Sequence, residues 1–387
     1  MPTKTKFLLI LLFALVLASP LIVNMNVFDE ELTAPVAEIL NGSPTVQADT
    51  GYRDVLALAD DAVPILEAEQ SNYTACSART QLGCLDVLRD DLLAAPVARG
   101  GALDGLLKRY RRLAENGNYR GPSDPGAPYS HWGPTLKLAA LDLARRSLVN
   151  DNFVEAVSQD LQFWQQVYKN GNSMLDKMVG VAGLWTTLQF SSEYVNLETV
   201  PEADAIRLAS LAGSVRLDLK RMVTPFDHEF RIFTAMMDPA GDFLPGNTSL
   251  LERHFGALML QPNATSNRFY RRVISPVLCQ LELSVGDLHR GGASRCLNTE
   301  SGWGFVIYNP YGKLSIEALG TLGDYVYRVH DLNTLAGLVA YQLTQGAGRS
   351  PNMEDHVPNE VQVTQAVGEI SFECLDRHSV CKLTTSP

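Results

Sequence analysis

The amino-acid sequence lacks the short motifs by which common classes of enzyme are identified. No H-E-x-x-H motif places two histidines on one helix face, and no G-x-S-x-G motif supplies a nucleophile elbow. The pair Gly312-Lys313 is no Walker loop, because Ile307 and Leu314 stand where that loop needs glycine and Ser or Thr. The sequence therefore carries no signature of a zinc protease, of a hydrolase with a nucleophile elbow or of a nucleotide-binding Walker loop. A Ser-His-Asp triad can still assemble in space from residues distant in the sequence.

Metal-ligand spacing is equally scarce. The seven histidines are scattered and no C-x-x-C occurs, so Asp227-His228-Glu229 is the nearest approach to a metal cluster. Adjacent residues on a helix point in different directions, and we interpret these three as capping or surface residues. The sequence therefore predicts no metal and no cofactor.

The chain also has little positive charge and no repeat of fixed period. Its formal net charge is −11, and the first 23 residues contribute two lysines and no acids, so the remainder is more acidic still. Nucleic acid is not an expected partner. We interpret the one basic cluster, Lys108-Arg109-Tyr110-Arg111-Arg112, as a solvated helix face; the alternative is a patch for lipid headgroups or an acidic partner. The missing repeat argues against the recognised helical solenoids.

One long apolar run is present, at the N-terminus. Residues 1–6 form a short stub with Lys4 and Lys6, and Phe7–Val23 follows without a charge. This pattern predicts an export signal whose lysines stay on the cytoplasmic side. We favour an uncleaved signal anchor in a bacterial inner membrane, with a single pass and the body in the periplasm. The alternative is a soluble periplasmic protein released by cleavage after Ala18.

Six cysteines fall into three close pairs along the chain: Cys76 with Cys84, Cys279 with Cys296, and Cys374 with Cys381. Short loops close most easily, so we expect these three local disulfides. Disulfides fit an oxidising compartment. A zinc site built from Cys374, His378 and Cys381 is the rival interpretation, but structural zinc sites usually use shorter spacings.

The periodicity predicts a mainly α protein. Residues 24–50 show little periodicity and are expected to be a spacer, whereas residues 51–345 form a helical periplasmic domain. Residues 346–387 are predicted to be a loop and a small β-hairpin packed on that domain, with Cys374 and Cys381 clamping the two arms.

The segment 173–190 is apolar on nearly every side and is expected to be the central helix. Gly180 and Gly183 share a face on which a neighbouring helix can approach closely. Lys177 lies beside the apolar stripe of this helix. We expect its side chain to reach solvent from the first turn, and the functional alternative is a base or an ion-pair anchor.

Two sets of residues are candidates for function. Lys177, His131, Ser130 and Asp124 are the weak catalytic candidates, three of them in the long loop 116–134. Asn263, Asn267, Asn309 and Lys313 are the weak binding candidates, although Asn263 and Asn267 are first expected to cap and turn into a helix.

Three short patches carry a resemblance to a known family: Lys177-Met178, Pro262-Asn-Ala-Thr265 with Asn267, and Asn309-Pro310 with Gly312-Lys313. Together they resemble an uncharacterised family of membrane-anchored proteobacterial envelope proteins. The resemblance is confined to residues 100–345 and implies an N-terminal anchor and a helical periplasmic body. It implies no established activity.

The sequence thus leads to two functional hypotheses. The first is a non-catalytic, membrane-anchored protein that binds another envelope component, which can be a protein. The alternative is a helical envelope hydrolase with a site near loop 116–134.

Overall fold

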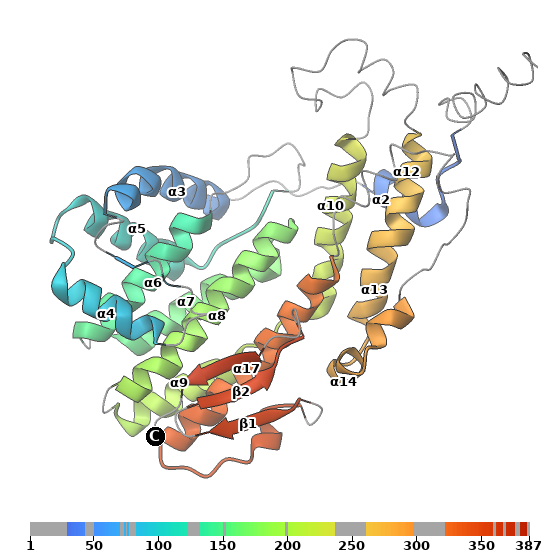
Figure 1. Cartoon of the computed structure of the whole chain (residues 1–387). Helices are drawn as coiled ribbons and strands as arrows, with labels where there is room; N and C mark the ends of the chain where they lie inside the picture. The colour runs from blue at the N-terminus through green and yellow to red at the C-terminus, as the bar shows by residue number, and fades with distance from the viewer. Residues whose placement is uncertain are drawn as a thin grey trace, which may run out of the picture. The chain divides into compact units, whose positions relative to one another are not determined.

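A computed structural model shows a mainly α-helical protein with a small antiparallel sheet near the C-terminus, as the sequence predicts (Figure 1). The structure describes residues 29–42, 50–69, 73–74, 76, 83–122, 132–149, 152–197, 200–236, 261–296, 322–358, 361–366, 369–375 and 380–384. The expected anchor at 7–23 lies outside these residues. Within them, no helix combines the length and the apolar character needed to cross a membrane.

The chain is divided into two compact units. The smaller unit comprises Met1–Pro44, Phe226–Glu282 and Ala293–Gly323, and the larger unit comprises Thr45–Pro225, Leu283–Gly292 and Asp324–Pro387. Residues 51–345, expected to form one helical domain, contribute to both units. The periodicity identifies helices but carries no information on which of them share a core, because that is decided by contacts between distant parts of the chain.

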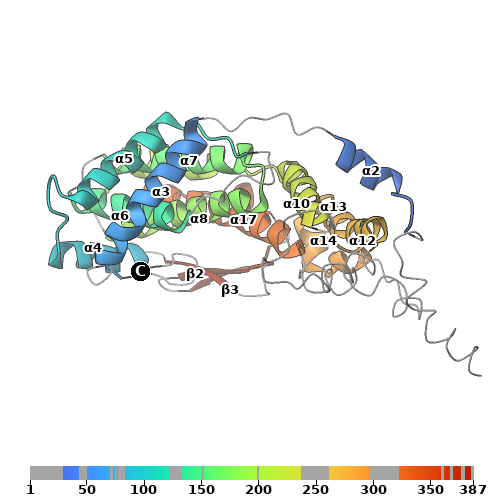
Figure 2. The same cartoon turned by 90° about the horizontal axis from the view of Figure 1, so that it is seen from above.

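The larger unit is a helical bundle built around α8 (Met174–Leu197), which contacts helices on several sides (Figure 2). The other helices are α3 (Thr50–Glu69), α4 (Cys84–Ala94), α5 (Ala102–Asn116), α6 (Trp132–Val149), α7 (Phe153–Asn170), α9 (Glu202–Ser214), η2 (Leu219–Met222), α14 (Val285–His289), α17 (Gly323–Gly346) and η5 (Met353–Asp355). The expectation of a central helix at 173–190 is confirmed.

Helix α7 packs on the glycine face of α8. A Cβ atom on Gly180 would lie 2.8 Å from the backbone nitrogen of Tyr168, and one on Gly183 would lie 2.2 Å from the ring of Trp164. Both glycines are therefore required by the close approach of the two helices, as the sequence indicates.

The C-terminal sheet has the strand order β1-β2-β3, from β1 (Val363–Ala366), β2 (Glu369–Glu373) and β3 (Val380–Thr384). Strands β2 and β3 form the predicted hairpin, with Phe372 opposite Cys381, and β1 adds a third antiparallel strand. The buried carboxylate of Asp331 on α17 accepts a hydrogen bond from the backbone N–H of Leu375 at 2.8 Å. The sheet is thereby attached to α17.

The smaller unit contains α2 (Ala34–Asn41), α10 (Val223–Met236, which begins three residues before the unit), α12 (Pro262–Phe269), the π-helical turn η3 (Tyr270–Ile274), α13 (Ser275–Leu281) and η4 (Gly292–Cys296). Its core includes aromatic contacts between α10 and α12. Phe230 stacks on Phe269 with ring centroids 5.7 Å apart, and Phe233 lies 4.1 Å from the same ring.

Residues 29–42, which lie in the segment expected to be a spacer, contain a short helix. They include α2, begun by a proline in its first turn, and the Arg231 guanidinium donates a hydrogen bond to the Gly42 carbonyl oxygen at 2.6 Å. Val36 is fully buried. The low periodicity of the sequence here reflects a short helix that buries a single apolar side chain.

All three expected disulfides are present: Cys76–Cys84, Cys279–Cys296 and Cys374–Cys381. Each joins residues no more than 17 positions apart. The zinc alternative at Cys374 and Cys381 is therefore incorrect, since both sulfurs are bonded to each other.

Candidate functional site

The structure separates the candidates named from the sequence into three groups. Asp124, Ser130, His131, Asn309 and Lys313 lie outside the described residues. Lys177 belongs to the larger unit, whereas Asn263 and Asn267 lie one turn apart on α12 in the smaller unit. The described residues contain no group of three or more potential metal ligands.

Lys177 is buried, contrary to the expectation that it reaches solvent. Its side chain is 1% exposed, and its Nζ donates hydrogen bonds to the carbonyl oxygens of Tyr168 and, at 3.3 Å, Lys169. These carbonyls end α7, where the helix dipole favours a cation. Burial lowers the Lys177 pKa to about 7, against the opposing effect of the neighbouring Asp176 carboxylate.

Asp176 lies in a second buried polar cluster beside Lys177. Its carboxylate accepts a hydrogen bond from the indole nitrogen of Trp132 at 3.2 Å, and its backbone nitrogen donates to the Ser173 hydroxyl. Burial raises the Asp176 pKa. The loop segment ahead of α6 packs tightly here, because a Cβ atom on Gly121 would lie 2.5 Å from the Asp176 carboxylate. Little space is left for a substrate at this position.

The two asparagines of α12 bind the chain's own N-terminal segment. The Asn263 side-chain amide donates to the Glu30 carbonyl oxygen at 2.9 Å. The Asn267 amide donates to the Glu31 carbonyl oxygen at 2.8 Å, and its oxygen accepts from the Thr33 backbone nitrogen at 2.9 Å. Asn263 and Asn267 thus hydrogen-bond residues 30–33 of the same chain.

The same segment supplies the cap of α12. Gln261 at the N-cap makes no side-chain capping bond, and the Asp29 carboxylate takes that role from a distant part of the sequence. It accepts hydrogen bonds from the backbone nitrogens of Asn263 at 2.7 Å and Ala264 at 2.8 Å. An acidic group at a helix N-terminus is stabilised by both the orphan N–H groups and the helix dipole.

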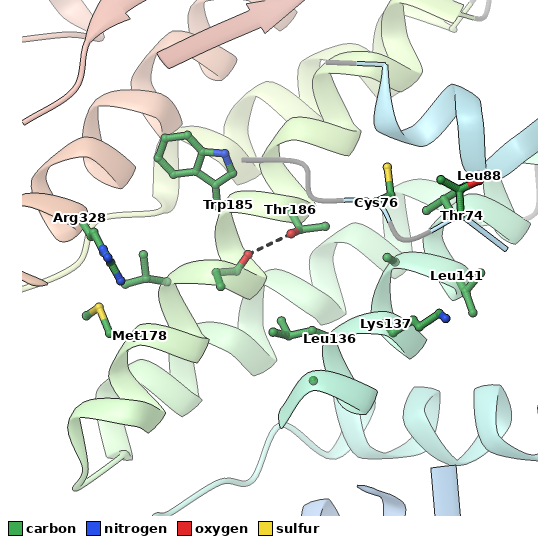
Figure 3. Close-up of a pocket in the computed structure, with 14 residues that line it drawn as sticks. Thr74, Cys76, Leu88, Leu136, Lys137, Leu141, Met178, Trp185, Thr186 and Arg328 are labelled. Atoms are coloured by element: carbon green, nitrogen blue, oxygen red, sulfur yellow. Dashed lines mark hydrogen bonds between the residues drawn. The ribbon is translucent and has the colours of Figure 1, made fainter. Parts of the chain in front are cut away.

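The larger unit contains an apolar groove of about 350 Å³ between α6 and α8, shown in Figure 3. Its lining residues are Thr74, Cys76, Leu88, Gly133, Leu136, Lys137, Ala140, Leu141, Met178, Val181, Ala182, Trp185, Thr186 and Arg328. Met178, Ala182 and Thr186 follow one another at four-residue steps along one face of α8. The groove therefore follows the helix for about 12 Å.

Two cations stand at different sides of this groove. In Figure 3 the Arg328 and Lys137 side chains are drawn at opposite sides of the group of lining residues, and the Lys137 amine points away from Arg328. Lys137 forms no ion pair or side-chain hydrogen bond with any described residue. The Arg328 guanidinium lies 5.3 Å from the Tyr325 ring centroid on its own helix. The groove thus combines apolar walls with positive charge.

Sequence reasoning selected none of the groove residues for function, apart from Met178 in a resemblance patch. The structure exposes one apolar face of α8, where Leu175 is 41% exposed and Ala182 is also exposed. The sequence of 173–190, apolar on nearly every side, predicts a central helix and does not mark an exposed face. The structure leaves one face of it uncovered by the described residues.

No protein-family model, curated protein or solved structure matches the chain.

Proposed function

We propose that this protein is a membrane-tethered, non-catalytic component of a bacterial envelope, which binds an apolar, acidic segment of another envelope protein in the α6–α8 groove. The groove is the observation that carries the proposal. Ligand sites are concave, mostly apolar and marked by a few polar groups, and this groove meets each criterion.

The shape and charge of the groove favour a peptide segment as the occupant. Met178, Ala182 and Thr186 offer contacts at helical intervals, which suits an amphipathic helix laid along α8. Lys137 and Arg328 would face carboxylates on that segment. Oppositely charged rims of this kind set the specificity and the rate of association.

The proposed location in the cell envelope is supported by the sequence and by the disulfides. Phe7–Val23 has the charge pattern of an export segment, and the uncleaved anchor is the form we propose. The three disulfides support an oxidising compartment such as the periplasm.

The hydrolase alternative receives no support from Lys177. Its amine donates hydrogen bonds to the carbonyl oxygens of Tyr168 and Lys169, and the side chain is buried, so a substrate cannot reach it. A structural role at the end of α7 accounts for its burial.

Site-specific photo-crosslinking in living cells tests the proposal. A photoreactive amino acid at Ala182, which lines the groove, is expected to crosslink the full chain to a defined segment of another envelope protein. Mass spectrometry should show that this segment is apolar and contains Asp or Glu. The same residue placed at Leu93, which is 66% exposed and outside the groove, is the matched control and should give no such product.

Charge reversal provides the second arm. Lys137→Glu should reduce the crosslink by at least roughly fivefold, since a like-charge contact costs more than about 1 kcal/mol. Lys137→Arg should retain it, and Lys220→Glu, at an exposed lysine outside the groove, should leave it unchanged. A crosslink to phospholipid, to another segment of this chain, or equally from Leu93 would contradict the proposal.

The tether has a separate test. The mass of the mature protein purified from membranes should include residues 1–23. A protein that begins after Ala18 would replace the anchored form with the soluble periplasmic alternative, and it would leave the groove result intact.

A further inference from the structure

A second concave site lies between α5 and α6, where positive charge gathers on a strongly acidic protein. This cleft has a volume of about 620 Å³. Six cations line it: Arg99, Lys108, Arg111, Arg112, Arg145 and Arg146. Among the described residues that line it, Asp104 and Asp142 are the acidic ones, so cations exceed carboxylates by four in a chain with a net charge of −11.

Asp104 holds two of the cations in place. Its carboxylate, 2% exposed, receives Lys108 at 2.8 Å and Arg145 at 2.7 Å, and it also accepts the Gly100 backbone N–H. These contacts keep the Asp104 pKa well below its usual range, so this carboxylate stays ionised.

Asp142 and Asp160 hold Arg111 and Arg146. The Asp142 carboxylate pairs with Arg111 and, at 3.1 Å, with Arg146. Behind the cleft, the fully buried Asp160 carboxylate lies 3.2 Å from the Arg111 guanidinium. Arg111 is itself only 5% exposed. Arg111, Arg145 and Arg146 are therefore held in position before any ligand arrives, which lowers the entropic cost of binding one, whereas Lys108 is paired but exposed.

The other two cations, Arg99 and Arg112, are exposed and form no side-chain bond with any described residue. Lys108 and Arg112 are also one helical turn apart, an arrangement in which like charges repel. A solvated helix face would spread such charges into water. Here cations from two helices and the preceding loop converge on one concavity.

We propose that the α5–α6 cleft is a binding site for the phosphate group of an anionic ligand. Arginine suits this ligand because its planar guanidinium pairs with phosphate oxygens through two parallel hydrogen bonds. Fixed Arg111, Arg145 and Arg146 supply the floor, and Arg99 and Arg112 close on the ligand from the rim. Both a soluble phosphorylated compound and the headgroup of an anionic lipid present this chemistry.

Calorimetric titration of the purified full chain in detergent tests the site with two probes. Inorganic pyrophosphate represents the soluble source, and monomeric dihexanoyl phosphatidylglycerol represents the lipid source, with dihexanoyl phosphatidylcholine as its zwitterionic control. Binding of at least one anionic probe is expected, and it should weaken as NaCl is raised.

The decisive variant is Arg99→Gln with Arg112→Gln, which leaves the buried ion pairs untouched. Its affinity should fall by at least about tenfold, because two charge-assisted contacts to phosphate are lost. Arg216→Gln with Lys220→Gln removes the same charge at exposed positions outside the cleft and should stay within about twofold of the unmodified protein. Thermal unfolding confirms that each variant is folded.

The outcomes are distinct. Binding of pyrophosphate alone assigns a soluble ligand, and binding of the phosphatidylglycerol probe alone assigns a lipid headgroup. Binding of neither, or equal losses in the cleft variant and its control, would overturn the proposal. None of these results bears on the α6–α8 groove, so the two proposals fail independently.

Discussion

The Nζ atom of Lys177 donates a hydrogen bond to the carbonyl oxygen of Tyr168, so a side chain from the first turn of α8 caps the end of α7. Only three residues separate the two helices in sequence. The amine therefore joins two packed helices at their connection, and its protonation is coupled to folding.

Lys177→Met is expected to remove part of the pH dependence of stability. The Lys177 pKa is lowered to about 7 by burial, whereas an unfolded lysine has a pKa near 10.4. Between these values the unfolded chain holds a proton that the folded protein has released, so stability rises with pH. The free energy of unfolding of the unmodified protein, minus that of the variant, should therefore increase by up to about 1.4 kcal/mol per pH unit above pH 7.

Urea unfolding at several pH values between 6 and 9.5 measures this difference. Lys169→Met, at an exposed neighbouring lysine, is the control and should keep the pH dependence of the unmodified protein. A difference that stays constant with pH would mean that Lys177 remains charged in the folded state.

Asp29→Ala should loosen the N-terminus of α12. The Asp29 carboxylate caps the backbone nitrogens of Asn263 and Ala264, and loss of a cap costs about 1–2 kcal/mol. Amide hydrogen exchange at Ala264 should accelerate by roughly 5- to 30-fold if the helix end opens locally. Glu31→Ala removes an equal charge from an exposed side chain but keeps the backbone carbonyl that Asn267 binds. Equal exchange in both variants would count against a capping role for Asp29.

Gly183→Ala should destabilise the larger unit. Its new Cβ atom would lie 2.2 Å from the Trp164 ring, and overpacking of a core typically costs about 1–3 kcal/mol. Gly105→Ala on α5 is the matched control, because nothing lies within 4 Å of its Cβ position. That change should stabilise the protein by about 0.5–1 kcal/mol through helix propensity. The two variants should therefore shift the urea midpoint in opposite directions, and shifts of the same sign would argue against the close packing of α7 on α8.

The cysteines offer a prediction about the compartment. Because all six cysteines are paired in the structure, the protein isolated from its native compartment should react with a thiol alkylating agent only after reduction. Intact-mass analysis under denaturing conditions counts the adducts. Alkylation without reduction would indicate a reducing compartment and would contradict the proposed location in the periplasm.

Local patterns predicted the features that depend on neighbouring residues. Gly180 and Gly183 indicated a close helix approach because each weakens a helix unless its missing side chain makes room. The cysteine pairs were predictable from their spacing. The hairpin followed from the change to a two-residue period after residue 360, although the third strand, β1, was not separated from it.

The expectation that the Lys177 side chain reaches solvent was wrong because a neighbouring helix lies at that end of α8. Side chains in an α-helix lean toward its N-terminus, so a lysine in the first turn was expected to reach solvent beyond that end. In this fold the end of α7 occupies that place, and its carbonyl oxygens accept the amine. The preceding helix could have been considered as a partner, because the turn between α7 and α8 is short.

The roles of Asn263 and Asn267 were beyond local reasoning. Their partners at residues 30–33 lie more than 230 positions earlier in the chain. No spacing or periodicity reports a contact of that range. The α5–α6 cleft was missed for a similar reason, since Arg145 and Arg146 join the basic cluster of α5 only when the two helices pack together.

Because residues 29–33 are attached to α12, only a short linker separates the proposed membrane anchor from the smaller unit. Five residues, 24–28, separate the end of the apolar run at Val23 from Asp29, which α12 binds. Even a fully extended backbone of that length reaches only about 20 Å. The N-terminal end of α12 would then be confined to a thin layer next to the lipid headgroups. A partner would meet this unit of the protein close to the membrane surface, within a distance limited by the length of residues 24–28.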